Sequence, residues 1–310
     1  MIMALSASCA KSGVTYDMQE SISIKPLTTN MTKAAVGTTP TGQELVIYAN
    51  YTEGQAPGTV FLDNAVFEED TPGIWTGKAQ EYYWPKNGLL TFAGHTNLPA
   101  EYGTVGYSYV DNTISVLDYK QSLNPAETID FLWFNQTEAT NNHLTGKANL
   151  EPLFNHALTW ITIQGIGKED SIGWQIRRLT LKGIKDKGSL TCTTEGPVWK
   201  NVTETTTDQI FHIYKETDPT KYYALQEKAT PIENTARGTV LIPQEPLMLE
   251  IEYLNGTIWE TIEVDLKISD DSTKNFWNAG KHYVYNLTFN PYKISFSVSI
   301  NSIGDVFVGF

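Results

Sequence analysis

The sequence has little positive charge for its length. Its 310 residues include 22 Lys and Arg against 35 Asp and Glu, which gives a formal net charge of −13. No basic stripe is present that could neutralise the phosphates of a nucleic acid, and the acidic balance equally opposes attraction to an anionic membrane surface. We therefore expect no nucleic-acid partner and no membrane binding by charge.

Cysteines and long apolar runs are also scarce. Only Cys9 and Cys192 are present, so a disulfide framework cannot hold the fold and the cores must depend on apolar burial. No run of about 18 apolar residues occurs, so no segment is predicted to span a membrane. Cys192 is expected to act as a small apolar side chain in or near a strand.

Motifs for catalysis or metal binding are missing as well. The five histidines are scattered without metal-ligand spacing, at His95, His143, His156, His212 and His282. The chain has no EF-hand loop, phosphate-binding loop, complete dinucleotide fingerprint or Gly-x-Ser-x-Gly elbow. The sequence therefore predicts no enzyme, no cofactor and no metal site, and His156 is expected to be structural.

The first nine residues contain the one predicted modification site. Small residues precede the cysteine in Leu5-Ser6-Ala7-Ser8-Cys9, a pattern similar to the cleavage box of a bacterial lipoprotein signal. A lipid on Cys9 would attach the mature chain to a membrane through its acyl chains. The apolar stretch is shorter than that of a full signal peptide, and the alternative is a disordered tail with a free thiol.

Strand signals are abundant along the rest of the chain. Short segments rich in β-branched and aromatic residues are bounded by Gly, Pro, Asn or Asp. They predict strands at 43–50, 59–67, 81–85, 89–93, 107–109, 113–119, 129–134, 158–164, 174–181, 211–214, 222–225 and 239–242. No segment shows a helical period over three turns, although a short helical turn fits residues 125–127.

A polar stretch at 135–149 interrupts this series and is typical of a loop or domain junction. We therefore predict an all-β fold with a tail at 1–19. Two tandem antiparallel β-sandwich domains follow it, at 20–147 and 148–310.

The segment from Leu247 to Leu266 is predicted to form a hairpin. Asn255-Gly256 is a preferred two-residue turn, and it would set Tyr253 opposite Ile258 and Leu249 opposite Ile262. The apolar residues then share one face of the pair, on which only Glu260 is out of place.

Near the C-terminus, apolar residues alternate with Lys or Ser in a strand, at Ile294, Phe296, Val298 and Ile300. Such a strand can place four apolar side chains in a groove while its polar face stays in water. The groove could belong to the same molecule or to a neighbour.

The aromatic run Tyr82-Tyr83-Trp84-Pro85 allows two interpretations. Alternation along a strand directs at least one ring to water or to another layer. In the first interpretation the rings pack in the core or cover a strand edge. In the second they form a platform that stacks on sugars.

Four segments in order resemble the fimbrillin family, the Mfa-like subunits of type V pili. They are the aromatic run with Leu90-Thr91-Phe92-Ala93-Gly94, then 154–159, 179–184 and 277–288. The resemblance implies a lipoprotein precursor with two β-sandwich domains, the second similar to transthyretin. It also implies that a surface protease removes an N-terminal strand, after which a C-terminal strand of the next subunit fills the groove.

The resemblance assigns roles to several residues of this chain. Ile22 and Ile24 lie in the removable strand, and Lys33 lies where the family often has an arginine cleavage site. An arginine-specific protease would not cut after Lys33, so either another protease acts or this is an uncleaved tip or anchor subunit. The strand from Ile294 to Ile300 is the expected donor, and the alternative is that it closes its own sheet.

The leading functional hypothesis is a structural or accessory subunit of a cell-surface pilus that supports adhesion. Its partners would be other pilus subunits and a host or bacterial surface ligand, with contact to the outer membrane only through the lipid. The alternative is a lipid-anchored outer-membrane protein that binds glycans.

Overall fold

The structure, a computed structural model, describes residues 16–27, 42–54, 58–139, 149–233, 239–269, 271–290 and 293–302. These residues form β-strands and five single-turn 3-10 helices, so the all-β prediction is confirmed. The 3-10 helices are η1 (Ala100–Tyr102), η2 (Pro125–Glu127), η3 (Glu169–Ser171), η4 (Pro219–Lys221) and η5 (Ser272–Lys274). In the part of the chain described, no helix is long and apolar enough to cross a membrane.

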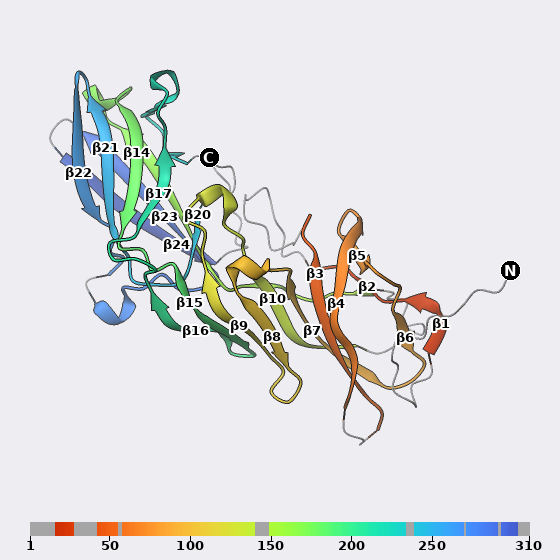
Figure 1. Cartoon of the computed structure of the whole chain (residues 1–310). Helices are drawn as coiled ribbons and strands as arrows, with labels where there is room; N and C mark the ends of the chain where they lie inside the picture. Colours follow the sequence, from red (N-terminus) through yellow and green to blue (C-terminus); the bar gives the residue numbers. More distant parts are fainter. Residues whose placement is uncertain are drawn as a thin grey trace.

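An eight-stranded N-terminal sheet forms one end of the molecule (Figure 1). Its order is β11 (Asn149–Leu150), β2 (Ser23–Ile24), β5 (Ile74–Gly77), β4 (Thr59–Thr71), β3 (Leu45–Thr52), β7 (Leu89–Thr96), β10 (Leu132–Ala139) and β12 (Asn155–His156). A separate pair, β1 (Tyr16–Ser21) and β6 (Tyr83–Pro85), lies beside it. One apolar core packs on this sheet and contains Trp75, Trp84 and Phe92.

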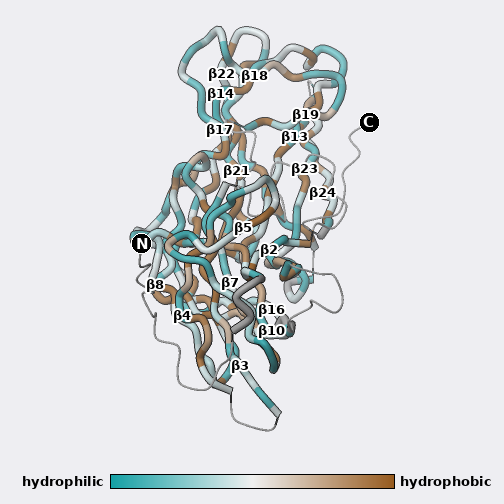
Figure 2. The backbone as a smooth tube through the Cα atoms, turned by 90° about the vertical axis from the view of Figure 1, so that its right-hand side faces the viewer, coloured by the Kyte–Doolittle hydropathy of each residue, from teal (hydrophilic) through white to brown (hydrophobic). Residues whose placement is uncertain are grey.

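The opposite end is a sandwich of two sheets. The β13 sheet comprises β19 (Thr230–Pro231), β13 (Thr159–Gly167), β23 (Lys281–Asn290) and β24 (Lys293–Ser302), with β20 (Thr239–Leu241) also paired to β13. The β14 sheet comprises β17 (Ile210–Lys215), β14 (Gln175–Lys182), β21 (Met248–Asn255) and β22 (Ile258–Asp265), with β18 (Tyr223–Ala224) also paired to β14. Residues of both sheets share one core, and hydrophobic and hydrophilic stretches alternate along the strands (Figure 2).

A four-stranded central sheet lies between these two ends (Figure 1). Its order is β16 (Gly196–Thr203), β15 (Lys187–Thr193), β9 (Thr113–Lys120) and β8 (Thr104–Ser108). A third core contains Val116 and Tyr119 of β9 together with Leu190 and Cys192 of β15. Cys192 is fully buried there, as expected of a small apolar side chain.

Two features refine the predicted architecture. The pairs β13–β23 and β2–β11 run parallel, whereas the remaining pairs are antiparallel. The central sheet also joins strands from before and after residue 147. The division into domains at 20–147 and 148–310 therefore stays a prediction, and the chain on its two sides shares a sheet.

The predicted hairpin forms, but its register is shifted by two residues. Leu249 pairs with Val264 and Tyr253 with Glu260, because Gly256 and Thr257 make the turn. Gly256 takes the first central position with a φ of 63°, a conformation that favours glycine. A shift of two residues keeps every side chain on its predicted face. In the observed register Glu260 lies opposite Tyr253, whose hydroxyl donates a hydrogen bond to its carboxylate at 2.6 Å. This bond accounts for a charged residue on the apolar face.

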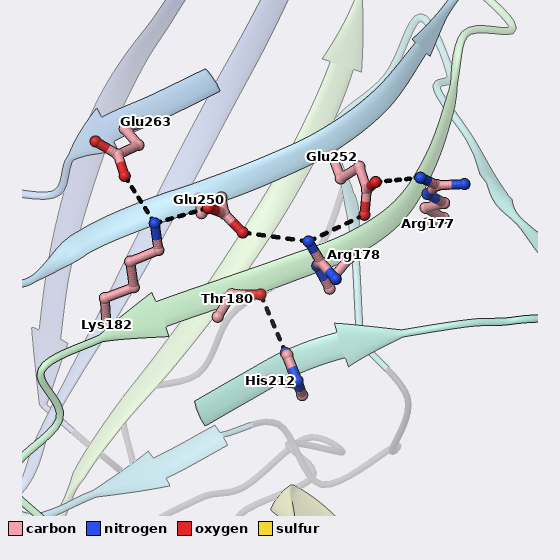
Figure 3. Close-up of polar contacts among 8 residues, drawn as sticks. All are labelled: Arg177, Arg178, Thr180, Lys182, His212, Glu250, Glu252 and Glu263. Carbon is pink, nitrogen blue, oxygen red and sulfur yellow. Dashed lines mark hydrogen bonds and ion pairs between the residues drawn. The ribbon is translucent and has the colours of Figure 1, made fainter. Parts of the chain in front are cut away.

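The outer face of the β14 sheet carries a continuous set of ion pairs (Figure 3). Arg177 and Arg178 contact Glu252, and Lys182 bridges Glu250 and Glu263 at 2.7 and 2.9 Å. The guanidinium of Arg177 also lies 4.1 Å from the ring centroid of Trp259. Each cation of this set therefore has a carboxylate partner.

We predict that Glu252→Gln lowers the free energy of unfolding at neutral pH by about 1 kcal/mol. The hydrogen bond from Arg177 holds the pKa of Glu252 below its ordinary value of 4.5, so the carboxylate stabilises the fold above that pH. This stability is lost as the pH falls through the folded-state pKa, and wild type and variant should then converge. Urea titrations at pH 7 and pH 3 measure the difference; an unchanged difference at both pH values contradicts the assignment. Glu263→Gln, at a half-exposed carboxylate, is the control with the smaller expected effect.

Candidate functional site

The N-terminal segment 16–27 fills a groove between distant parts of the chain. Ile24 of β2 pairs antiparallel with Trp75 of β5 on one side and parallel with Leu150 of β11 on the other. β1 continues the segment and pairs with β6, where Ser21 lies opposite Tyr83. Ile24 therefore lies in a strand and Ile22 lies between β1 and β2, while removal of this segment stays a prediction. The pairing partners of Ile24 lie about 50 and 125 residues further along the chain.

Side-chain burial and a few backbone hydrogen bonds hold this segment. Ile22 and Ile24 have no exposed surface and belong to the core of the N-terminal sheet. The amides of Ile22, Lys25 and Leu27 donate to the carbonyls of Tyr82, Leu150 and Pro152 at 2.6, 2.8 and 2.9 Å. The Ser23 hydroxyl also donates to the side-chain carbonyl of Asn149.

Removal of this segment would uncover two strand edges and two apolar pockets. β2 lies between β5 and β11, so its loss leaves one edge of each without a partner. It also opens the core where Ile22 and Ile24 lie. A groove of this kind matches an extended strand with apolar side chains at alternate positions.

The C-terminal strand β24 lies at the edge of the β13 sheet. It runs antiparallel to β23 along its whole length, from Lys293 opposite Asn290 to Ser302 opposite Lys281. The predicted alternative, in which this strand closes its own sheet, is the arrangement seen in the isolated chain. Donation to a neighbour stays a prediction.

The four predicted donor residues are buried to different extents. Ile294, Phe296 and Val298 are half-buried against the core of the C-terminal sandwich, and the Phe296 ring centroid lies 6.1 Å from that of Tyr285. Ile300 is 49% exposed, although it shares their face. The C-terminal strand is therefore less completely buried in its own chain than the N-terminal strand, whose Ile22 and Ile24 are fully covered.

Two predicted site residues cannot be placed. Cys9 and Lys33 lie outside the described residues, as does His143. The proposed lipid and cleavage sites therefore stay predictions that rest on the sequence.

Three of the histidines and Cys192 are buried in the fold. Burial lowers the pKa of His95 and of His282 to about 4, so both are neutral near pH 7. His156 is buried and its Nδ1 lies 2.7 Å from a carboxylate oxygen of Asp130. Burial also raises the pKa of the Cys192 thiol, which suppresses the reactive thiolate. Among the described residues, no group of three or more His, Cys, Asp or Glu could hold a metal ion.

The aromatic run 82–85 packs against its own chain. Trp84 is 3% exposed and meets Phe92 edge-on at 5.7 Å between centroids. Tyr82 stacks on Phe67 at 5.5 Å, and the Tyr83 hydroxyl donates to Glu81. These contacts match the core-packing interpretation of the run.

A family model described as fimbrillin-like matches residues 32–302. This chain belongs to the fimbrillin-like family. Its members are structural proteins of cell-surface fimbriae and not enzymes, so the chain is a fimbrial protein of the cell surface. A comparison with curated protein sequences found no match.

Solved structures from three Bacteroides species share the fold. A fimbrial protein from Bacteroides vulgatus matches with a TM-score of 0.59 at 15% identity, over 84% of this chain and 92% of that one. A proposed cell adhesion protein from Bacteroides uniformis matches with a TM-score of 0.56 at 13% identity, over 92% and 98%. A proposed cell adhesion protein from Bacteroides ovatus gives 0.54 at 17% identity, over 93% and 96%. At these identities the likeness establishes the fold alone.

We predict that Ile24→Asp releases the segment 16–27 from its groove. A carboxylate at this fully buried position has no cation to pair with among the contacts described, at a cost of about 3 kcal/mol or more. Hydrogen exchange should accelerate in β5, β11 and β6 while the C-terminal sandwich keeps its protection. Leu27→Asp, at a side chain that is 46% exposed, is the control and should leave these rates unchanged. Global unfolding of the Ile24 variant would show that the segment is inseparable from the fold.

Proposed function

We propose that this fimbrial protein is a structural or accessory subunit that joins its neighbours by β-strand donation. The observation that carries the proposal is the groove between β5 and β11, which a terminal segment fills with two fully buried isoleucines. Once that segment is removed, the open groove is complementary to an extended strand of another subunit. Backbone hydrogen bonds would supply affinity and the two pockets would set the register.

β24 has the properties that a donor needs. Its apolar residues recur at every second position, which is also the spacing of Ile22 and Ile24. Because the strand lies at a sheet edge, it can leave β23 without breaking a second ladder. Ile294, Phe296 and Val298 are only half-buried in their own sheet. Full burial of an apolar side chain in a neighbour's groove would contribute about 1.5–3 kcal/mol to binding.

Processing at the N-terminus belongs to the same proposal. Lys33 follows the segment 16–27 in the sequence, so cleavage after it would separate that segment from the rest of the chain. A lipid on Cys9 would hold the uncleaved precursor at the outer membrane. Two domains at 20–147 and 148–310, the second similar to transthyretin, would form each subunit, and the assembled pilus would support adhesion to host or bacterial surfaces.

We expect the double substitution Phe296→Asp with Val298→Asp to block polymer assembly while folded monomer is still exported. Carboxylates cannot enter an apolar groove without a large desolvation cost. Ser297→Asp with Ser299→Asp adds the same charge on the exposed face of the strand and should still polymerise. Negative-stain microscopy and denaturing gels of surface extracts report the outcome. Polymer formed by the first variant would refute the donor assignment, and an unfolded monomer would assign the strand to its own core.

Lys33→Ala should accumulate as a membrane-attached, unpolymerised precursor, because the N-terminal segment then stays in its groove. Adding Cys9→Ala should release that precursor into the soluble fraction. Mass spectrometry of the N-terminal peptide and membrane fractionation measure both effects, with Lys25→Ala as the control at an exposed lysine of the same segment. Normal polymers assembled from chains that retain residues before Lys33 would instead identify a subunit that is not processed there.

A further inference from the structure

A polar groove lies in the outer face of the central sheet, away from both terminal strands. Its volume is about 520 Å³, within the range typical of small-ligand sites. The described lining comes from three adjacent strands and consists of Asp118, Lys120, Lys187, Gly188, Ser189, Asn201 and Thr203. Apart from Gly188, every lining residue carries a charged or hydrogen-bonding side-chain group.

Two β-bulges shape the groove, one on each side of β15. The pairing of β15 with β9 shifts between Gly188 and Leu190, and its pairing with β16 shifts between Lys187 and Ser189. Asp118 and Asn201 belong to these bulges and adopt left-handed backbone conformations, with φ of 53° and 54°. Such bulges redirect side chains and are common beside functional sites.

Glycine at position 188 lets β15 lie close to β16. A Cβ there would lie 3.2 Å from Val202 Cγ2 and 3.3 Å from the Lys200 carbonyl oxygen. Both distances are tighter than most Cβ contacts, so a side chain would require Val202 and the backbone at Lys200 to shift. A residue without a side chain therefore fits the close packing of β15 against β16 beside the groove.

Unpaired positive charge gathers at the groove. Lys187 on β15 lies directly opposite Lys120 on β9, and like charges in such a pair destabilise a sheet. Lys200 lies opposite Ser189 on the neighbouring strand β16. In the part of the chain that the structure describes, none of these three lysines has a carboxylate within ion-pair distance. On the β14 sheet, by contrast, Arg177, Arg178 and Lys182 all have carboxylate partners.

Hydrogen-bonding groups surround the lysine pair. The side chains of Asp118, Ser189, Asn201 and Thr203 make no hydrogen bond to another side chain or backbone group among the described residues. Together they offer hydroxyl, carboxamide and carboxylate groups to whatever occupies the groove. Asp118 would repel a compact dianion such as phosphate, but it can accept hydrogen bonds from hydroxyl groups.

We infer that this groove binds an acidic saccharide, a short stretch of glycan that carries a uronic or sialic acid. Its carboxylate pairs with Lys120 and Lys187, and its hydroxyl groups bond to Asp118, Ser189, Asn201 and Thr203. The inference rests on the adhesive part of the proposed function and names its ligand class. It is independent of subunit assembly, because the groove residues lie on neither terminal strand.

The test is calorimetric titration of the full-length protein with trigalacturonic acid and 3′-sialyllactose, against galactotriose and lactose as neutral counterparts. The acidic sugars should bind and the neutral ones should bind at least about tenfold more weakly, since hydrogen bonds to charged groups contribute strongly. Lys120→Gln with Lys187→Gln should lower the affinity for the acidic sugars at least about tenfold. Lys86→Gln with Lys228→Gln makes the same change in net charge at two exposed lysines elsewhere and should leave the affinity unchanged.

Asp118→Asn separates a saccharide site from a simple anion site. It keeps a residue that tolerates the left-handed conformation. It should weaken saccharide binding, whereas it would strengthen the binding of sulfate alone. Equal binding of acidic and neutral sugars, no binding of any of the four, or lysine-dependent self-association without sugar binding would each overturn the inference. Polymer assembly by the lysine variants, followed by microscopy, shows separately whether the proposed assembly holds.

Discussion

A strand inside a sheet needs partners on both of its edges, and this requirement governs the N-terminal half of the molecule. β2 is only two residues long, yet it connects β5 to β11, which is otherwise unpaired among the described strands. The segment 16–27 therefore pairs with residues 149–150, which lie near the middle of the chain. Whatever fills this position, the segment itself or a strand from another molecule, must supply backbone hydrogen bonds on two sides and apolar groups for two closed pockets.

The central sheet connects the N-terminal half to the other end of the molecule. Its β9 and β15 come from opposite sides of residue 147, and their inner side chains share a core with Trp160 of β13. The indole of Trp199 donates to the Ala157 carbonyl at 2.8 Å and meets the ring of Tyr119 edge-on. The two ends are thus joined through a packed core as well as through the chain.

Local patterns in the sequence predicted much of this fold, and weak local signals together with non-local pairing explain what they missed. Turn residues and alternation located the hairpin at 247–266, but the turn itself moved by one residue because glycine took its first central position. β15 and β16 escaped prediction because Lys187, Gly188 and Asn201 carry little strand propensity and two bulges interrupt the alternation. No local signal could show that Ile24 lies between Trp75 and Leu150, since that pairing is fixed by tertiary packing.

The net charge of the chain does not determine the charge of each sheet face. The net charge of −13 argues against nucleic acid as a partner, but it says nothing about how charges are distributed among the sheet faces. On the β14 sheet, carboxylates neutralise every neighbouring cation of the outer face in Figure 3. On the central sheet, Lys120 and Lys187 face each other without such partners in the described structure. An acidic chain has carboxylates in excess, so a face that leaves two adjacent lysines unmatched leaves its positive charge available to a ligand from outside the chain.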